Sequence, residues 1–324
     1  MSLLHKTIKA HLNWVYKVAQ RPYGFWHRSY LVNGKPKDNA IFQLDQQCYP
    51  LLELCDYLDY FPTDMSFVES LLQLDVIPQM LQLLESKRDD DTGLWPTDET
   101  PGDDAVIYPY HFSSHVLLWH TLSRLQDLYS KLQSSGIHMP RILDRLTASL
   151  RDTTIKVFTV TRPDTRDQIF AYLTDGKGNH TLYHDANDIP TLFAPEWGFV
   201  SERELSIWHN TMSFGLSPDN KQGYCSTGLY LGLGSVHSPG AWVLGYYQEL
   251  AYAASRKQEN DMREAWRKIG AAMHWDGTFS EAVNPYTAEC SSKAWFSWPG
   301  AMIGALVIRL RREGLEDILL SPGC

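Results

Sequence analysis

Apolar side chains recur every three or four residues along much of the chain, which is the spacing of one buried helix face. The clearest stripes run over residues 4–19, 112–125 and 242–253. Pro78 should break or kink the helix that contains it. Ser238-Pro239 and Ser297-Trp298-Pro299 each predict a helix start. The same spacing predicts further helices near residues 46–60, 66–87, 140–156, 201–212 and 258–273.

Strand signals are few. Residues 157–183 contain two β-branched and aromatic runs followed by the turn DGKGN, which predicts a small hairpin, and residues 29–36 predict another turn. No linker or composition shift divides the chain, so we expect one domain over residues 1–324. About ten helices joined by alternating short and long connections suit an α/α toroid, although periodicity leaves a bundle or a solenoid open.

Composition and charge narrow the class of protein. The chain is 44% hydrophobic and 21% charged, as expected for a packed globular protein. Its formal net charge of −9, without a basic block, argues against a nucleic-acid partner. No segment has the length and apolarity of a signal peptide or a membrane span. Five cysteines without a CxxC motif predict reduced thiols and a cytoplasmic location.

Acidic, aromatic and glycine residues are concentrated in the long connections, near 89–109, 174–198, 217–240 and 274–298. Active sites are commonly built from such loops on a helical scaffold. Residues 93–105 of the first connection hold four carboxylates, with Asp103 and Asp104 adjacent, just before a helix predicted near Pro109. This segment is either a solvated acidic loop at a helix start or the place of a general acid, since adjacent like charges can raise the pKa of one carboxyl. Glu281, in the last connection, is either a surface glutamate or a general base.

Other loop residues are candidates for binding. Asp185 and Asn187 suit sugar hydroxyls, whereas capping of a helical turn at Pro190 is a sufficient role for Asp188. His237 is either structural or a hydrogen-bond donor to a ligand, and Asp45 either caps the next helix or lines a pocket. The 11 Trp and 17 Tyr residues are compatible with sugar stacking as well as with core packing. We find no Walker motif, no HExxH and no GxSxG elbow, so we expect no metal and no cofactor.

Five segments, taken in order, resemble glycoside hydrolase family 125, the metal-independent exo-α-1,6-mannosidases. They are QLDQQCYP, PGDDAVIYPYHFSS, HDANDIPTLFAPEWGFV, GLGSVHSP and GTFSEAVNP, the last followed by KAWFSWPGAMIGALVI. The segment SYLVNGKPKDNAIFQLDQQ also resembles the family 15 glucoamylase group. The resemblance implies an all-α, (α/α)6 toroid of the six-hairpin glycosidase class with small β-hairpin insertions.

The resemblance also implies an inverting mechanism, with the general acid at Asp103 or Asp104 and the general base at Glu281. Asp45, Asp185, Asn187, His237 and Trp295 then become candidate sugar contacts. Two features depart from the family. Its upstream tryptophan-leucine-arginine-aspartate-serine motif has no match, since FWHRS at 25–29 is not equivalent, so we expect the toroid to be short of one N-terminal hairpin. Ser280 also stands where the family has a histidine before the base.

The sequence therefore predicts an inverting, exo-acting α-glycosidase, with a carbohydrate as partner, no nucleic acid and no membrane; oligomeric state, sugar and linkage stay open. Two alternatives are retained. One is a sugar lyase or epimerase on the same scaffold, and the other is an inactive carbohydrate-binding relative.

Overall fold

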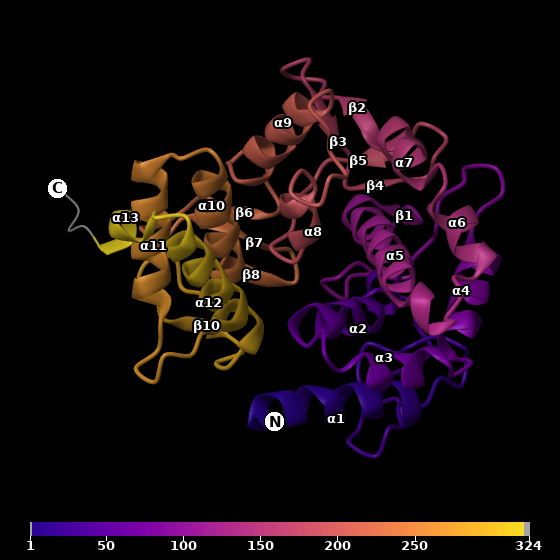
Figure 1. Cartoon of the computed structure of the whole chain (residues 1–324). Coiled ribbons are helices and arrows are strands. Elements are labelled where there is room, and N and C mark those ends of the chain that lie inside the picture. The colour runs from indigo at the N-terminus through magenta and orange to yellow at the C-terminus, as the bar shows by residue number, and fades with distance from the viewer. Residues whose placement is uncertain (1, 321–324) are drawn as a thin grey trace. The chain divides into compact units, whose positions relative to one another are not determined.

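The computed structural model describes residues 2–320, and helices dominate it (Figure 1). The chain divides into two compact units. The first contains residues 1–159 and 173–180, and the second contains residues 160–172 and 181–324.

The first unit is built from helices around one long, buried helix. α5 (Phe112–Leu132) buries side chains on nearly every face and packs against α2, α6 and α7. A helix that is apolar all round belongs in the interior of a unit. The other elements of this unit are α1 (Leu3–Lys17), η1 (Asp45–Gln47), α2 (Tyr49–Tyr60), α3 (Met65–Leu72), α4 (Val76–Lys87), β1 (Tyr110–His111), η2 (Gln133–Ser135), α6 (Arg141–Thr147), α7 (Leu150–Phe158) and β4 (Leu173–Thr174).

Two predicted helices are each divided in two. The predicted helix over 66–87 is interrupted between α3 and α4, and Pro78 lies in the first turn of α4, where its missing N–H has no intrahelical role. The predicted helix over 140–156 ends at Thr147 and restarts at Leu150. Ser149 between them has φ of 63°, a left-handed conformation that cannot continue the ladder of helical hydrogen bonds.

The predicted hairpin forms, but from shorter strands. Residues 157–158 belong to α7, and β2 (Thr159–Thr161) pairs with β3 (Gln168–Phe170). β4 lies between β1 and β5 (His180–Thr181). The turn DGKGN connects β4 to β5, and the Asp175 carboxylate accepts hydrogen bonds from the backbone of Lys177 and Asn179. The turn predicted at 29–36 is closed by a bridge between Tyr30 and Pro36.

The second unit is centred on α10 (Val243–Ser255), which packs against α8, α11 and α12; α10 and α11 lie side by side in Figure 1. Small residues let neighbouring elements approach this helix closely. A side chain at Gly245 would collide with the backbone of Leu233. The remaining helices of this unit are α8 (Ile189–Phe193), α9 (Leu205–Gly215), α11 (Glu259–Ala272), α12 (Ser297–Arg312) and α13 (Glu316–Leu320).

A five-stranded antiparallel sheet covers the start of α10. Its order is β10 (Cys290–Ser292), β9 (Ala282–Val283), β8 (Ser238–Trp242), β7 (Gly232–Ser235) and β6 (Tyr224–Cys225). The helix start predicted at Ser238-Pro239 is therefore wrong, because these residues form β8 and the helix begins five residues later, at Val243. The fixed φ of proline suits an extended segment as well as a first helical turn. Hydrogen bonding of β8 to both β7 and β9 selects the extended conformation over the helical one.

In residues 2–320, no helix combines the length and apolarity needed to cross a membrane. Cys48, Cys55, Cys225 and Cys290 are free thiols, as predicted, while Cys324 lies outside the described residues.

Candidate active site

The acidic connection of the first unit is a tight, hydrogen-bonded loop. Its two arms are joined by a bridge between Glu99 and Ala105, and the Thr100 amide donates to the Asp104 carbonyl at 2.9 Å. Asp103 lies at the tip with φ of 63°, and its side chain is 58% exposed. A left-handed backbone is uncommon for aspartate. The helix after the loop begins at Phe112, three residues later than predicted, with His111 as its N-cap.

Two side chains from earlier in the chain hold this loop. The Gln43 side-chain amide donates to Asp103 Oδ1 at 2.7 Å and to Glu99 at 3.2 Å. The Arg28 guanidinium donates to Glu99 at 2.6 Å and lies 3.4 Å from Asp103. The segments around residues 28, 43 and 99–104 are thus tied together by charge-assisted hydrogen bonds.

The carboxyl of this loop with a raised pKa is that of Glu99, which is not one of the predicted catalytic residues. Burial raises the pKa of Glu99, the Arg28 charge opposes that shift, and the nearby Asp103, Asp104 and Asp98 charges add to it. Glu99 is therefore a further candidate for proton transfer beside Asp103 and Asp104.

Asp45 is buried beside this loop, with only 5% of its surface exposed. It does not cap α2, because no side chain caps that helix and Asp45 lies in the preceding η1 turn. Burial raises the pKa of Asp45 to about 7, with the His111 charge opposing the shift and the Asp103 charge adding to it. Among the described residues, its Oδ1 atom has no hydrogen-bond partner. In its protonated form this carboxyl can offer both a donor and an acceptor to a hydroxyl group.

The base of the acidic loop is anchored by a neutral histidine. His115 is fully buried, and burial lowers its pKa to about 4. Its Nε2 atom accepts a hydrogen bond from the Trp95 amide at 3.0 Å, and its Nδ1 lies 2.7 Å from the His111 carbonyl. Because a carbonyl only accepts, the proton belongs on Nδ1. The buried histidine thus fixes Trp95, which precedes the acidic loop, to the first turn of α5.

In the second unit, Glu281 is buried rather than solvated, with 2% of its side chain exposed. This burial excludes the interpretation of Glu281 as an ordinary surface glutamate. Its carboxylate accepts hydrogen bonds from the Ser292 hydroxyl at 3.0 Å and from the Lys293 ammonium at 2.5 Å. The backbone on both sides is fixed, since β9 follows directly and the Glu281 carbonyl accepts from the Val243 amide. The carboxylate is therefore held in one orientation.

The other candidates of this unit have different environments. Trp295 is 69% exposed and offers an open aromatic face. His237 is also exposed; its Nδ1 lies 2.9 Å from the Ser235 hydroxyl, and its ring stands edge-on to Trp242. Both side chains can be reached by a ligand, so their role in sugar binding stays a prediction.

Asp185 and Asn187 are buried and bound mainly to their own unit. The Asp185 carboxylate accepts hydrogen bonds from the Tyr183 and Ser235 hydroxyls and from both the backbone and the side chain of Asn187. The predicted cap by Asp188 is wrong, because its carboxylate accepts from the Asp185 amide at 3.1 Å instead of capping α8. These contacts fold the loop onto β7, and direct sugar contacts of Asp185 and Asn187 stay predictions.

Sequence reasoning missed the partners of the predicted catalytic residues. They are Arg28, Gln43 and Glu99 in the first unit, and Ser292 and Lys293 in the second. Glu99 was visible as a member of the acidic loop, but Arg28 carries no local signal, because 71 residues separate it from Glu99. In the described part of the chain, no group of three or more His, Cys, Asp or Glu side chains could hold a metal ion.

Similar solved structures share this fold. A metal-independent α-mannosidase from Streptococcus pneumoniae, in a non-productive complex with α-1,6-mannobiose, matches with a TM-score of 0.76 and 19% identity, covering 94% of this chain and 79% of that chain. A bacterial glucoamylase complexed with acarbose matches with a TM-score of 0.61 and 15% identity, covering 98% and 50%. The predicted six-hairpin glycosidase fold class is confirmed.

The sequence itself is similar to curated and family sequences. The meiotically up-regulated gene 157 protein of Schizosaccharomyces pombe is 23% identical over 212 residues, which is 65% of this chain and 40% of that protein. The chain thus spans well under half of the curated relative that it matches. The model of the family described as metal-independent alpha-mannosidase (GH125) matches residues 82–308, more than two thirds of the chain. The chain therefore belongs to the metal-independent alpha-mannosidase family GH125.

Proposed function

We propose that the protein is an inverting, exo-acting α-mannoside hydrolase whose two units form a single catalytic domain over residues 1–324. Asp103 or Asp104 donates a proton to the leaving oxygen, and Glu281 activates a water. The observation that carries the proposal is the buried and oriented carboxylate of Glu281 in a member of this family. The structure of the pneumococcal relative with α-1,6-mannobiose makes that disaccharide the first substrate to test.

Glu281 has the features that a general base needs. The Lys293 ammonium and the Ser292 hydroxyl each occupy one carboxylate oxygen. Each oxygen keeps a further lone pair, which can accept a proton from water. Inversion requires the acid and base carboxyls to stand about 6.5–9.5 Å apart, so that a water fits between the base and the sugar.

The acid side of the proposal rests on the loop that presents Asp103 and Asp104. Gln43 and Arg28 fix its backbone and tip, which limits the positions that a leaving oxygen can take relative to these carboxyls. The buried Asp45 carboxyl and the exposed Trp295 ring are proposed to bind sugar, the first by hydrogen bonds and the second by stacking. His237 is proposed as a hydroxyl donor.

The test compares variants on substrates with different leaving groups. Glu281→Gln should lose about a hundredfold or more of its turnover on both α-1,6-mannobiose and dinitrophenyl α-mannoside, because both need activated water. Loss of the acid should affect only mannobiose, since dinitrophenolate leaves without a proton. Whichever of Asp103→Asn and Asp104→Asn shows that difference identifies the acid. Glu289→Gln, an exposed glutamate eight residues after Glu281, is the matched control.

The alternatives give other results. Product that takes up no labelled oxygen from ¹⁸O-water would establish a lyase or epimerase. Binding of oligosaccharide without release of sugar from any α-glycoside would establish an inactive carbohydrate-binding relative. Wild-type turnover in Glu281→Gln would end the assignment of the base.

A further inference from the structure

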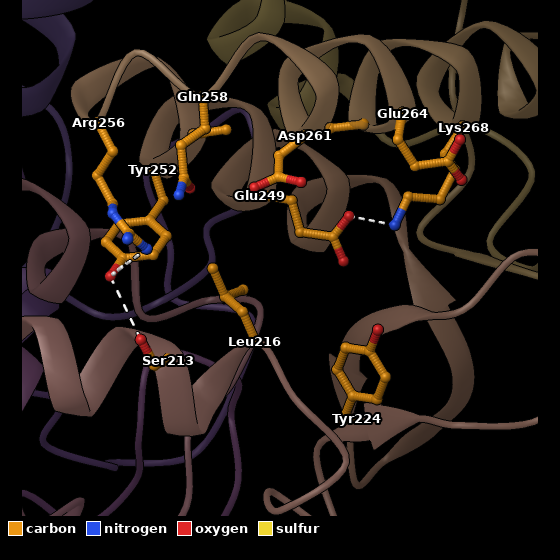
Figure 2. A pocket seen from close by; sticks show the side chains of 12 residues that line it. Ser213, Leu216, Tyr224, Glu249, Tyr252, Arg256, Gln258, Asp261, Glu264 and Lys268 are labelled. Atoms are coloured by element: carbon orange, nitrogen blue, oxygen red, sulfur yellow. Dashed lines mark hydrogen bonds and ion pairs between the residues drawn. The ribbon is translucent and has the colours of Figure 1, made fainter.

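The second unit contains a cavity that none of the predicted catalytic or sugar-contacting residues lines. It lies between α9, β6, α10 and α11 and has a volume of about 370 Å³ (Figure 2). Sites for small ligands in proteins generally span about 300–1,000 Å³, so this cavity suits one small molecule. Every lining residue belongs to the second unit.

A buried ion pair with one unused oxygen lies in the cavity wall. The Glu249 side chain is 14% exposed and the Lys268 side chain 8%. The Lys268 ammonium binds Glu249 Oε2 and donates to the Leu231 carbonyl at 3.0 Å. Within residues 2–320, no hydrogen bond reaches Glu249 Oε1, and in Figure 2 this carboxylate points into the open space of the cavity. A ligand group that donates a hydrogen bond would satisfy it.

Tyr224 faces the same space from β6 (Figure 2). Burial, followed by the Glu249 charge, raises the pKa of Tyr224 to about 12, so the phenol stays neutral and keeps its proton. It can both donate and accept a hydrogen bond. Leu216, Ala253 and Ala265 supply an apolar surface next to these polar groups.

The charges around the cavity nearly balance. Three carboxylates line it, and they face the cations Arg256 and Lys268. One of the three, Glu264, also binds Arg267, which stands outside the lining. A strongly charged ligand therefore gains little electrostatic binding energy in this cavity. The available carboxylate oxygens instead favour a ligand with several hydrogen-bond donors. A neutral polyol with one apolar face meets both conditions, and a pyranose ring is such a molecule.

We propose that this cavity is an accessory carbohydrate site, which binds one neutral pyranose through Glu249 and Tyr224 and packs the C–H face of the ring against Leu216. The proposal does not depend on hydrolysis. It makes the second unit a binding module as well as a proposed part of the catalytic domain.

Alanine methyl resonances test this directly, because Ala253 and Ala265 line the cavity. The full chain, labelled with ¹³C at alanine methyls, is titrated with methyl α-D-mannopyranoside, with D-glucose and, separately, with propylamine. Saturable shifts of both methyls with either sugar, and none with propylamine, are expected. Shifts with propylamine alone, or none with the sugars, would overturn the proposal.

Variants locate the binding. Leu216→Trp fills the cavity and should abolish the sugar-dependent shifts, while Leu229→Trp, at a residue that is 73% exposed and outside the lining, should preserve them. Tyr224→Phe removes one hydroxyl and should weaken binding by about threefold to tenfold, as expected for one hydrogen bond. Unchanged alanine methyl shifts away from the cavity establish that each variant is folded. Because the readout is local, it is independent of turnover, and failure here would leave the proposed hydrolase untouched.

Discussion

Replacing Asp45 by asparagine should make the protein increasingly more stable than the wild type as the pH rises from about 4 to about 8. The pKa of the Asp45 carboxyl is about 7 in the folded protein, against an ordinary value of about 3.8 for an aspartate in the unfolded chain. Between these values the folded state holds more protons than the unfolded state, so rising pH destabilises the wild type. Asparagine keeps the shape of a neutral carboxyl and cannot ionise.

The size of the stability difference between Asp45→Asn and wild type follows from the raised pKa of Asp45. A difference of about three pKa units, at about 1.4 kcal/mol per unit, gives an upper bound of about 4 kcal/mol. Near pH 4 the two proteins should have similar free energies of unfolding. Above pH 7 the difference should level off, because Asp45 is then ionised in both states of the wild type.

Urea unfolding followed by tryptophan fluorescence measures this difference at each pH. Asp152→Asn, at a side chain that is 82% exposed, is the control and should show little change with pH. A gap between Asp45→Asn and wild type that stays constant from about pH 4 to about pH 8 would refute the assignment of Asp45 as a buried carboxyl with a raised pKa.

Three further substitutions test a strained backbone position and two buried hydrogen bonds. Ser149→Gly should raise the thermal midpoint, since glycine removes a left-handed strain of about 1 kcal/mol and the Ser149 side chain accepts no capping hydrogen bond, so a lower midpoint would count against the argument. His115→Ala should cost about 2–4 kcal/mol in urea unfolding, because it leaves a cavity and an unpaired Trp95 amide, and a loss below about 1 kcal/mol would contradict that role. Tyr183→Phe should cost about 1–3 kcal/mol by removing a hydrogen bond to the buried Asp185 carboxylate, and a neutral effect would show that Asp185 finds other donors.

The sequence predicted the helical stripes well, because a helix with one apolar face is specified by residues three or four apart. α1, α5, α10 and α11 all lie where that spacing puts them. Boundaries were less predictable. Ser149 interrupts a helix through its backbone conformation, and Ser238-Pro239 forms a strand because β7 and β9 pair with it. Neither feature is contained in local propensity.

In the candidate site, too, local sequence predicts some features and the tertiary fold decides the others. The acidic loop and Glu281 were selected from local chemistry together with the resemblance. The groups that orient the acidic loop could not be selected in this way. Arg28 and Gln43 are 60 or more positions from Asp103 in the sequence and reach it only in the folded chain. Burial also decides which carboxyls have a raised pKa. Asp45 and Glu99 do, and neither stood out as a proton donor in the sequence.

The measurement that tests the central claim most directly is proton NMR of α-1,6-mannobiose during hydrolysis by the wild-type protein. The proposed mechanism predicts that the non-reducing mannose is released first as the β-anomer, which then mutarotates, and that Glu281→Gln releases none. Initial release of the α-anomer would contradict an inverting pair of carboxylates, and unchanged release by Glu281→Gln would contradict Glu281 as the base.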